Sequence, residues 1–344
     1  MILPLWPARI AETARAARAS RRGARVFTLA CLSLAASSAS PATAWAQFPD
    51  LVDVSAQYMP GAALEDPRPV KAQVTSYDVS LNVPIPLGKR TFLIPGLAYH
   101  VDSVSFADAP PGFTELRAFQ SLDLSLLFVQ LLPKDWALSL RAAPGIAGDF
   151  QGLDAGHFRI SAVALATHSF SDRLVLGGGG VATFSFGSFL PLPAVYLEWK
   201  PWRGLQIEGF IPAFVHTKYT IEDRVELGLR AEVAGNAYAV RDERVAAAWP
   251  CVPDTTGDPA IQEGDGAAQP SQCLDHVAYS VITAGPAVGV RLFKSVWWTT
   301  FAGHSVFRRF EQMNDDDDHV VGGAQDLPNV FFFRTGLTWR IPRD

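Results

Sequence analysis

Apolar and polar residues alternate along much of this 344-residue chain. From Leu122 to Phe128 the even positions are apolar, and the odd positions are polar except Leu127. Successive side chains of a β-strand point to opposite faces, so the pattern predicts a strand with one apolar and one polar face. It recurs around residues 136–142, 158–162, 195–200, 225–233 and 331–341. No comparably long segment has helical spacing, so the chain after residue 46 is predicted to be nearly all β.

The predicted strands are long, and their connections alternate between short and long. Strands of soluble sandwiches average about five or six residues, whereas a tilted strand crossing a bilayer needs ~9–11. Spanning length is reached near 70–85, 90–105, 115–131, 136–148, 157–170 and 276–293. Tight turns on one side and long loops on the other are typical of outer-membrane barrels. We therefore predict an antiparallel transmembrane β-barrel.

The number of strands depends on the region around Pro212. If 51–59 is the first strand, and if 205–211 and 213–221 are two strands joined by a tight external turn, the barrel has fourteen strands. Both of its ends then lie in the periplasm, and the number is even, as in bacterial single-chain barrels. Twelve strands is the alternative.

The positions of the prolines argue against a closed barrel, and those of the tryptophans argue for one. Proline cannot donate a ladder hydrogen bond, so prolines within strand patterns argue against a closed barrel unless they mark bulges or strand ends. These prolines are Pro84, Pro95, Pro144 and Pro286. Tryptophans near the predicted periplasmic strand ends favour a barrel, because aromatic girdles lie at the membrane interfaces. They are Trp136, Trp199, Trp202, Trp297, Trp298 and Trp339.

The N-terminus has the three parts of a secretory signal. Six arginines up to Arg25 precede the apolar segment 26–36, and a stretch of small residues ends at Ala44-Trp45-Ala46. We expect residues 1–46 to be a signal peptide of the general secretory route, cleaved after Ala46. Residues 47–344 would then form a single barrel domain.

The net charge of the mature chain argues against one class of partner, and its two cysteines suggest a disulfide. Removing residues 1–46 removes six Arg and one Glu and leaves a net charge of −10. An acidic exported chain without a basic patch is not expected to bind nucleic acid. Cys251 and Cys273 remain in one polar connection, where an oxidising compartment favours a disulfide between them.

Several short motifs lie at turns and strand ends of the predicted barrel. They are Ser171-Asp172-Arg173-Leu174-Val175-Leu176-Gly177, Phe189-Leu190-Pro191-Leu192-Pro193, Leu197-Glu198-Trp199-Lys200-Pro201, Phe210-Ile211-Pro212 and Glu222-Asp223-Arg224. With them the chain resembles an uncharacterised family of Gram-negative outer-membrane β-barrel proteins, a domain of unknown function. The resemblance covers most of residues 50–342 and implies this fold and location, but it carries over no activity and no site residue. The chain departs from the common aromatic ending of such proteins by stopping at Pro342-Arg343-Asp344.

Charged residues of both signs share the polar faces of the predicted strands. The lumen-lining candidates are Asp78, Asp123, Arg141, Arg159, Glu198, Lys200, Glu208, His216, Lys218, Glu226, Arg230, Glu232, Arg334 and Arg340. Such side chains either line a water-filled passage and set its selectivity, or form ion-pair networks in a closed lumen. A barrel of twelve to fourteen strands, intermediate between packed small barrels and open porins, is compatible with both.

Motifs for metal binding or catalysis are sparse. The run Asp315-Asp316-Asp317-Asp318 has oxygen ligands suited to Ca²⁺, but such runs are more often solvated loops, so no metal site is expected. The sequence contains no G-x-S-x-G, H-E-x-x-H or phosphate-binding glycine loop. We therefore expect no catalytic residue, no cofactor and no enzymatic activity.

Three functions fit this sequence. The first is a passive outer-membrane channel or transporter for small solutes, hydrophobic ones included. The second is a closed-lumen barrel with a structural or adhesive role that acts through its external loops. The third is a soluble periplasmic β protein. The expected partners are outer-membrane lipid, the barrel-assembly machinery during biogenesis, and a small-molecule solute.

Overall fold

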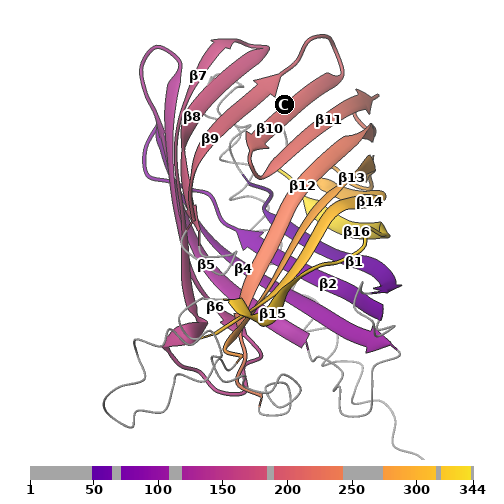
Figure 1. Cartoon of the computed structure of the whole chain (residues 1–344). Helices are drawn as coiled ribbons and strands as arrows, with labels where there is room; N and C mark the ends of the chain where they lie inside the picture. Colours follow the sequence, from indigo (N-terminus) through magenta and orange to yellow (C-terminus); the bar gives the residue numbers. More distant parts are fainter. Residues whose placement is uncertain are drawn as a thin grey trace, which may run out of the picture. The chain divides into compact units, whose positions relative to one another are not determined.

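The computed structural model describes residues 49–63, 71–107, 118–183, 190–242, 274–314 and 319–341, which form one sheet (Figure 1). In chain order the strands are β1 (Val52–Ala63), β2 (Lys71–Asn82), β3 (Ile85–Pro86), β4 (Thr91–Ala107), β5 (Ala118–Leu131), β6 (Trp136–Gly148), β7 (Phe158–Ser171), β8 (Leu174–Thr183), β9 (Leu190–Trp199), β10 (Leu205–Ile211), β11 (Phe214–Ile221), β12 (Val225–Ala239), β13 (His276–Arg291), β14 (Val296–Met313), β15 (His319–Asp326) and β16 (Phe331–Trp339). A 3-10 turn, Ala155–His157, precedes β7. Within the described ranges, no helix has the length and apolarity needed to span a membrane. The predicted signal peptide lies outside these ranges.

The sheet closes on itself. Each strand pairs antiparallel with its neighbour, β13 pairs with β14, and β16 joins β14 to β1, with Val52 opposite Trp339 and Tyr58 opposite Phe333. Fourteen strands form the ring, while the two-residue β3 and the strand β15 attach to β4 and β14. The prediction of fourteen strands is confirmed, including the tight β10–β11 turn at Pro212, and the alternative of twelve is excluded.

The two ends of the barrel differ in their connections. One end, here the turn end, has the short connections after β5, β7, β9, β11 and β13, together with the first residue of β1 and the last of β16. The other, here the loop end, has the connections after β1, β4, β6, β8, β12 and β14, and the β10–β11 turn. This is the predicted alternation of short and long connections.

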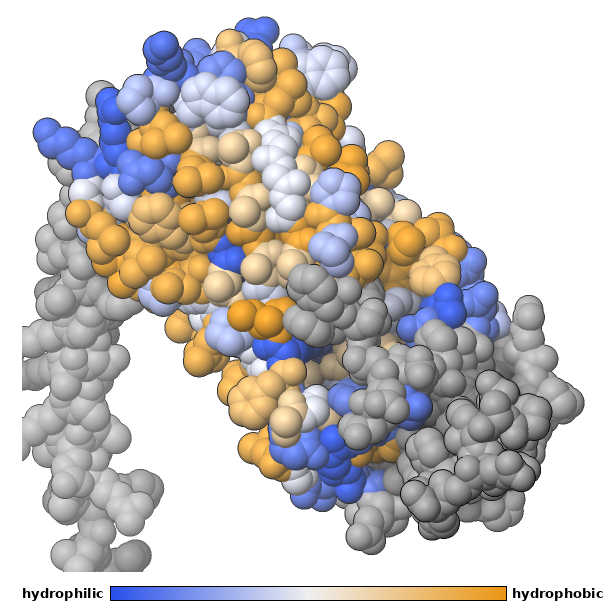
Figure 2. Space-filling view, turned by 60° about the vertical axis from the view of Figure 1, so that its left-hand side comes forward, coloured by the Kyte–Doolittle hydropathy of each residue, from blue (hydrophilic) through white to orange (hydrophobic). Residues whose placement is uncertain are grey.

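The outer face of the barrel is apolar. The side chain of Leu124 on β5 is 61% exposed and that of Leu229 on β12 is 64% exposed. Figure 2 shows hydrophobic side chains in a band across one face, with hydrophilic ones gathered towards the ends. A soluble barrel would not leave such a continuous apolar surface in water, so this band fits the hydrocarbon of a bilayer.

The tryptophans largely lie where a girdle requires them. Trp136, Trp199, Trp202, Trp298 and Trp339 are exposed at the turn end. Trp297 is an exception, because its ring is buried on the inner face, with the Arg340 guanidinium 4.6 Å from the ring centre. The one-residue alternation between Trp297 and Trp298 places their rings on opposite faces of the wall.

The prolines interrupt the ladder without shifting its register. Beside Pro144 the β5–β6 pairing passes from Asp123 opposite Gly145 to Leu126 opposite Ala142. Beside Pro286 the β13–β14 pairing passes from Ala284 opposite His304 to Ala287 opposite Phe301. Pro84 and Pro95 lie where the β2–β4 pairing ends. The prediction of strand ends therefore holds for Pro84, which lies between β2 and β3, whereas Pro95, Pro144 and Pro286 lie within β4, β6 and β13 and not at bulges.

The wall is lower on one side. β10 and β11 have seven and eight residues, whereas β12 has fifteen. Beyond β11, the loop-end part of β12 crosses to the end of β6, where Ala239 pairs in parallel with Gly148 (Figure 1). At the level of this β12–β6 contact, the ring is formed by the other strands and does not include β7 to β11. We call this loop-end region, in which β12 contacts β6, the neck.

One pair of substitutions tests whether the outer apolar band contacts lipid or is exposed to water. Leu124→Arg places a charge within the outer apolar band and should lower the free energy of unfolding in lipid vesicles by about 2–4 kcal/mol. Leu153→Arg is the control, since Leu153 is 67% exposed in the β6–β7 connection, and it should change stability by less than about 0.5 kcal/mol. Equal effects in urea titrations of the two variants would show that the band does not contact hydrocarbon.

Candidate functional site: the barrel interior

Charged side chains of β12 and β16 meet across the interior. Arg334 lies 3.3 Å from Glu232 and 3.4 Å from Asp78, and it donates to the Ser55 hydroxyl at 2.9 Å. Nearer the turn end, Arg340 pairs with Glu226 at 2.7 Å. Because β13 and β14 separate β12 from β16 in the sheet, these ion pairs join strands that are not neighbours.

The other candidates pair more locally. Arg159 on β7 binds Asp123 on β5, with Nη2 2.5 Å from Oδ2. Lys200 lies 2.7 Å from Glu198, and Arg230 forms an ion pair with Glu232. Glu208 and His216 lie opposite each other on β10 and β11, and Lys218 follows two residues later on the same face.

Arg141 differs from these residues. It lies on β6 opposite Val163, on the face of the strand that its alternation with Leu140 and Ala142 turns inward. Its side chain is exposed, and it forms no hydrogen bond or ion pair with another described residue. An unpaired cation with accessible surface on an inner face indicates water beside it.

A buried polar network that the sequence did not reveal lies nearer the loop end. His100 on β4 places Nδ1 2.6 Å from Asp78 and Nε2 3.0 Å from Asp102. Asp102 also accepts hydrogen bonds from Ser76 at 2.5 Å and from Tyr238 at 2.7 Å. Because carboxylates only accept, both ring nitrogens carry hydrogen and His100 is cationic.

Alternation alone could have placed His100 and Asp102 on the polar face of β4, since they are two residues apart. Their partner Tyr238 is 136 residues from Asp102, and no sequence pattern indicates that contact. Asn236, on the same strand as Tyr238, donates to Ser121 on β5 at 3.2 Å. The loop-end half of β12 therefore contacts β4 and β5 directly across the interior.

Apolar side chains fill the neck around this network. Met59, Phe119, Tyr238 and Phe332 are at most 2% exposed and belong to one cluster with residues of β2, β4, β6, β13 and β14. Phe119 stacks on Tyr238, with ring centres 5.2 Å apart. Inward-facing residues of most of the ring thus pack together and exclude water from the axis of the neck.

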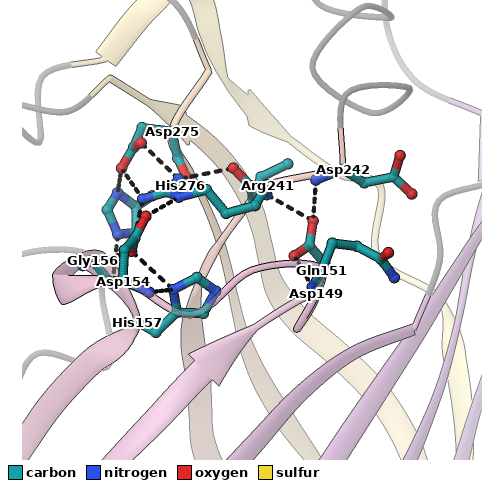
Figure 3. Close-up of polar contacts among 10 residues, drawn as sticks. Asp149, Gln151, Asp154, Gly156, His157, Arg241, Asp242, Asp275 and His276 are labelled. Carbon is teal, nitrogen blue, oxygen red and sulfur yellow. Dashed lines mark hydrogen bonds and ion pairs between the residues drawn. The ribbon is translucent and has the colours of Figure 1, made fainter.

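A second charged group, which we call the rim cluster, ties the end of β12 to the β6–β7 connection (Figure 3). It consists of Asp149, Asp154, His157, Arg241, Asp275 and His276. Arg241 bridges two carboxylates, Asp154 before β7 and Asp275 before β13, the latter at 2.7 Å. Asp149 accepts hydrogen bonds from the backbone N–H groups of Arg241 at 2.8 Å and Asp242 at 2.7 Å.

The rim cluster shifts the ionisation of its members. Hydrogen bonding from Arg241 holds the pKa of Asp154 well below its ordinary value of 3.8. Burial alone would raise the pKa of Asp275, but His276 and Arg241 outweigh it and the pKa is lowered. Both carboxylates therefore stay charged where a free aspartate begins to protonate.

Some predicted features lie outside the described residues. These are Cys251 and Cys273, and the acidic run Asp315 to Asp318. Within the described part of the chain, no group of three or more His, Cys, Asp or Glu side chains is arranged to hold a metal ion.

Comparison with known proteins gives a family and distant structural likenesses. Residues 42–248 match the family model described as Domain of unknown function (DUF6268). A search of curated proteins finds no match. Among solved structures, the COG4313 outer membrane channel from Pseudomonas putida F1 is 8% identical, with a TM-score of 0.42 over 88% of this chain and 99% of that one. The P. putida toluene transporter TodX is 8% identical, with a TM-score of 0.38 over 88% and 92%.

Two further likenesses come from other kinds of protein. The translocator domain of autotransporter NalP from Neisseria meningitidis is 11% identical, with a TM-score of 0.31 over 95% of this chain and 98% of that one. LpxR from Salmonella typhimurium is 10% identical, with a TM-score of 0.32 over 84% and 99%. At these identities and TM-scores, the likenesses assign no function to this chain.

The rim cluster makes stability depend on pH in a defined direction. The pKa values of Asp154 and Asp275 are lower in the folded chain than the ordinary value of 3.8. The two carboxylates therefore stabilise the fold fully at pH values above 3.8, and this stabilisation is lost as the pH falls through the lowered pKa values. Arg241→Met should lower the temperature of heat-induced unfolding by several degrees at pH 7, and the difference from the parent chain should shrink below about pH 4. Arg203→Met, at an exposed turn-end position, is the control and should behave like the parent. If the unfolding temperatures of Arg241→Met and the parent differed by the same amount at every pH, the two aspartates would not be stabilised by Arg241.

Proposed function

We propose that this chain, which belongs to the family described as Domain of unknown function (DUF6268), is an outer-membrane β-barrel that conducts small solutes through its interior. The apolar outer band and the closed fourteen-strand ring support the membrane location. The loop end would face the outside and the turn end the periplasm, as in other outer-membrane barrels.

The observation that carries the conduction proposal is the uneven filling of the interior. On the side of β12 to β5, inward side chains pack together across the axis. On the side of β6 to β11, Arg141 on β6 and Gly179 on β8 face inward and are exposed, although Leu165, Val175 and Tyr196 on the same inner face are buried in a small apolar cluster. We infer that water and small solutes pass along the inner face of β6 to β11.

A closed barrel with a structural or adhesive role is the second candidate, and the neck favours it. The apolar cluster and the Tyr238–Asp102 hydrogen bond obstruct a straight axial path. If the remaining space holds only trapped water, the barrel passes no steady current, so conductance distinguishes the two candidates.

Planar-bilayer recording of the purified chain should give a small, steady conductance, lower than that of sixteen-strand porins because the lumen is narrower and partly filled. Arg141→Glu should shift the reversal potential in a salt gradient towards cation selectivity, because it inverts an unpaired charge beside the path. Arg173→Glu, in the exposed β7–β8 turn, should leave selectivity nearly unchanged.

One result would count against conduction and another against the proposed path. Absence of current from a chain that is folded, as judged by heat-modifiable gel migration, would support the closed barrel. Equal selectivity shifts from the Arg141 and Arg173 variants would show that Arg141 is not beside the path.

A further inference from the structure

The hydrogen-bond ladder of the wall is incomplete between β9 and β12. β10 pairs with β9 only from Trp199 to Val195, so Leu190–Ala194 has no partner on that side among the described residues. β11 pairs with β12 only as far as Glu232, followed by one bond from the Val233 N–H to the Ala213 carbonyl. On the same edge of β12, the next ladder partner among the described residues is Gly148 of β6, which pairs with Ala239. We call this interruption the β9–β12 gap.

Two prolines occupy the β9 edge of the gap. Lys200 N–H donates to the Arg173 carbonyl, so even-numbered residues of β9 direct their backbone groups to β8 and odd-numbered ones away from it. The nitrogens of Pro191 and Pro193 therefore face the gap. Proline at both positions removes the two donors that this edge would offer, which prevents another strand from pairing there.

The β12 edge keeps its polar groups. The Val233 N–H and the Ala239 carbonyl both point to the gap side, and the alternation of a strand turns Gly235 and Ala237 the same way. These two residues have no ladder partner on that side among the described residues. Unpaired backbone groups at membrane depth persist only where they are buried in protein or line water. Ala234, which the same alternation turns inward, is exposed, so this edge borders open space and not packed protein.

Exposed outward side chains beside the gap are apolar. Ile211 at the β10–β11 turn is 54% exposed and Val233 is 37% exposed. Below the gap, the inner face of β7 to β10 carries an apolar cluster of Leu165, Val175, Tyr196 and Phe210. The unpaired stretch of β12, Ala234–Tyr238, is roughly 16 Å long at about 3.3 Å per residue.

We propose that the β9–β12 gap is a side opening through which small apolar solutes move between the lumen and the membrane hydrocarbon. The filled neck obstructs the straight axial path, the prolines keep the β9 edge free of added strands, and the apolar side chains beside the gap suit a solute that leaves into lipid. This proposal names the solute class and the exit of the proposed function, and so rests on it.

A lipid-borne quencher tests the opening without requiring conduction. A bimane fluorophore is attached to Ala234→Cys, at the gap, in vesicles of phosphatidylcholine with brominated acyl chains. The matched control is Ala287→Cys, on an inner face between two paired strands opposite Gly228 and Phe301. Ala231→Cys, on the outer face of β12, reports full contact with lipid.

The expected result is that bromine at least halves the fluorescence at Ala234 and at Ala231 and leaves that at Ala287 unchanged. Fluorescence at Ala234 that is as insensitive to bromine as that at Ala287 would overturn the side opening. Because this readout needs no current, the opening can fail while conduction holds, and conduction can fail while the opening holds.

The solute class is tested with bromobenzene dissolved in the lipid of unbrominated vesicles. A bimane at Val181→Cys, on the inner face of β8, should be quenched by at least half. Adding Ala234→Trp at the gap should remove most of this quenching, whereas Ala231→Trp should not. Quenching that Ala234→Trp leaves intact would show that apolar solutes do not enter through the gap.

Discussion

Every backbone N–H and C=O group inside hydrocarbon needs a partner, and the architecture of this chain follows from that requirement. A sheet meets it only by closing, so β1 pairs with β16 and the ring of fourteen strands has no edge at the turn end. Closure also fixes which residues contact lipid, because alternate side chains must point outwards. The apolar band on the outside and the charges inside are two consequences of one ring.

The requirement is relaxed over a longer stretch between β9 and β12. There the short β10–β11 hairpin leaves two strand edges that have no ladder partner within the described ranges, and other contacts hold β12 at a distance. Asn236 and Tyr238 attach it to β5 and β4, and Arg241 anchors its end to the β6–β7 connection. The same contacts fill the neck, so obstruction of the straight axial path and exposure of the gap have a common cause.

The sequence predicted much of the fold and part of the interior. Period-two alternation and turn spacing, which are local properties, predicted fourteen strands and left only the region around Pro212 open, with twelve as the alternative. Alternation also selected charged residues such as Arg334 and Glu232, but their contact joins positions 102 residues apart and depends on how the ring is folded. The pairing of Ala239 with Gly148 has no local signature, since both residues are small and neither carries a side-chain group that specifies a partner. Pro191 and Pro193 are plain in the sequence, yet their role depends on the direction in which each nitrogen points.

The central claim is that the outer band contacts hydrocarbon. Its most direct test is size-exclusion chromatography of the folded mature chain while detergent is withdrawn. The account predicts that the barrel elutes as a single species only in detergent or lipid and aggregates once these are removed. A folded, monodisperse protein in plain buffer would contradict the account.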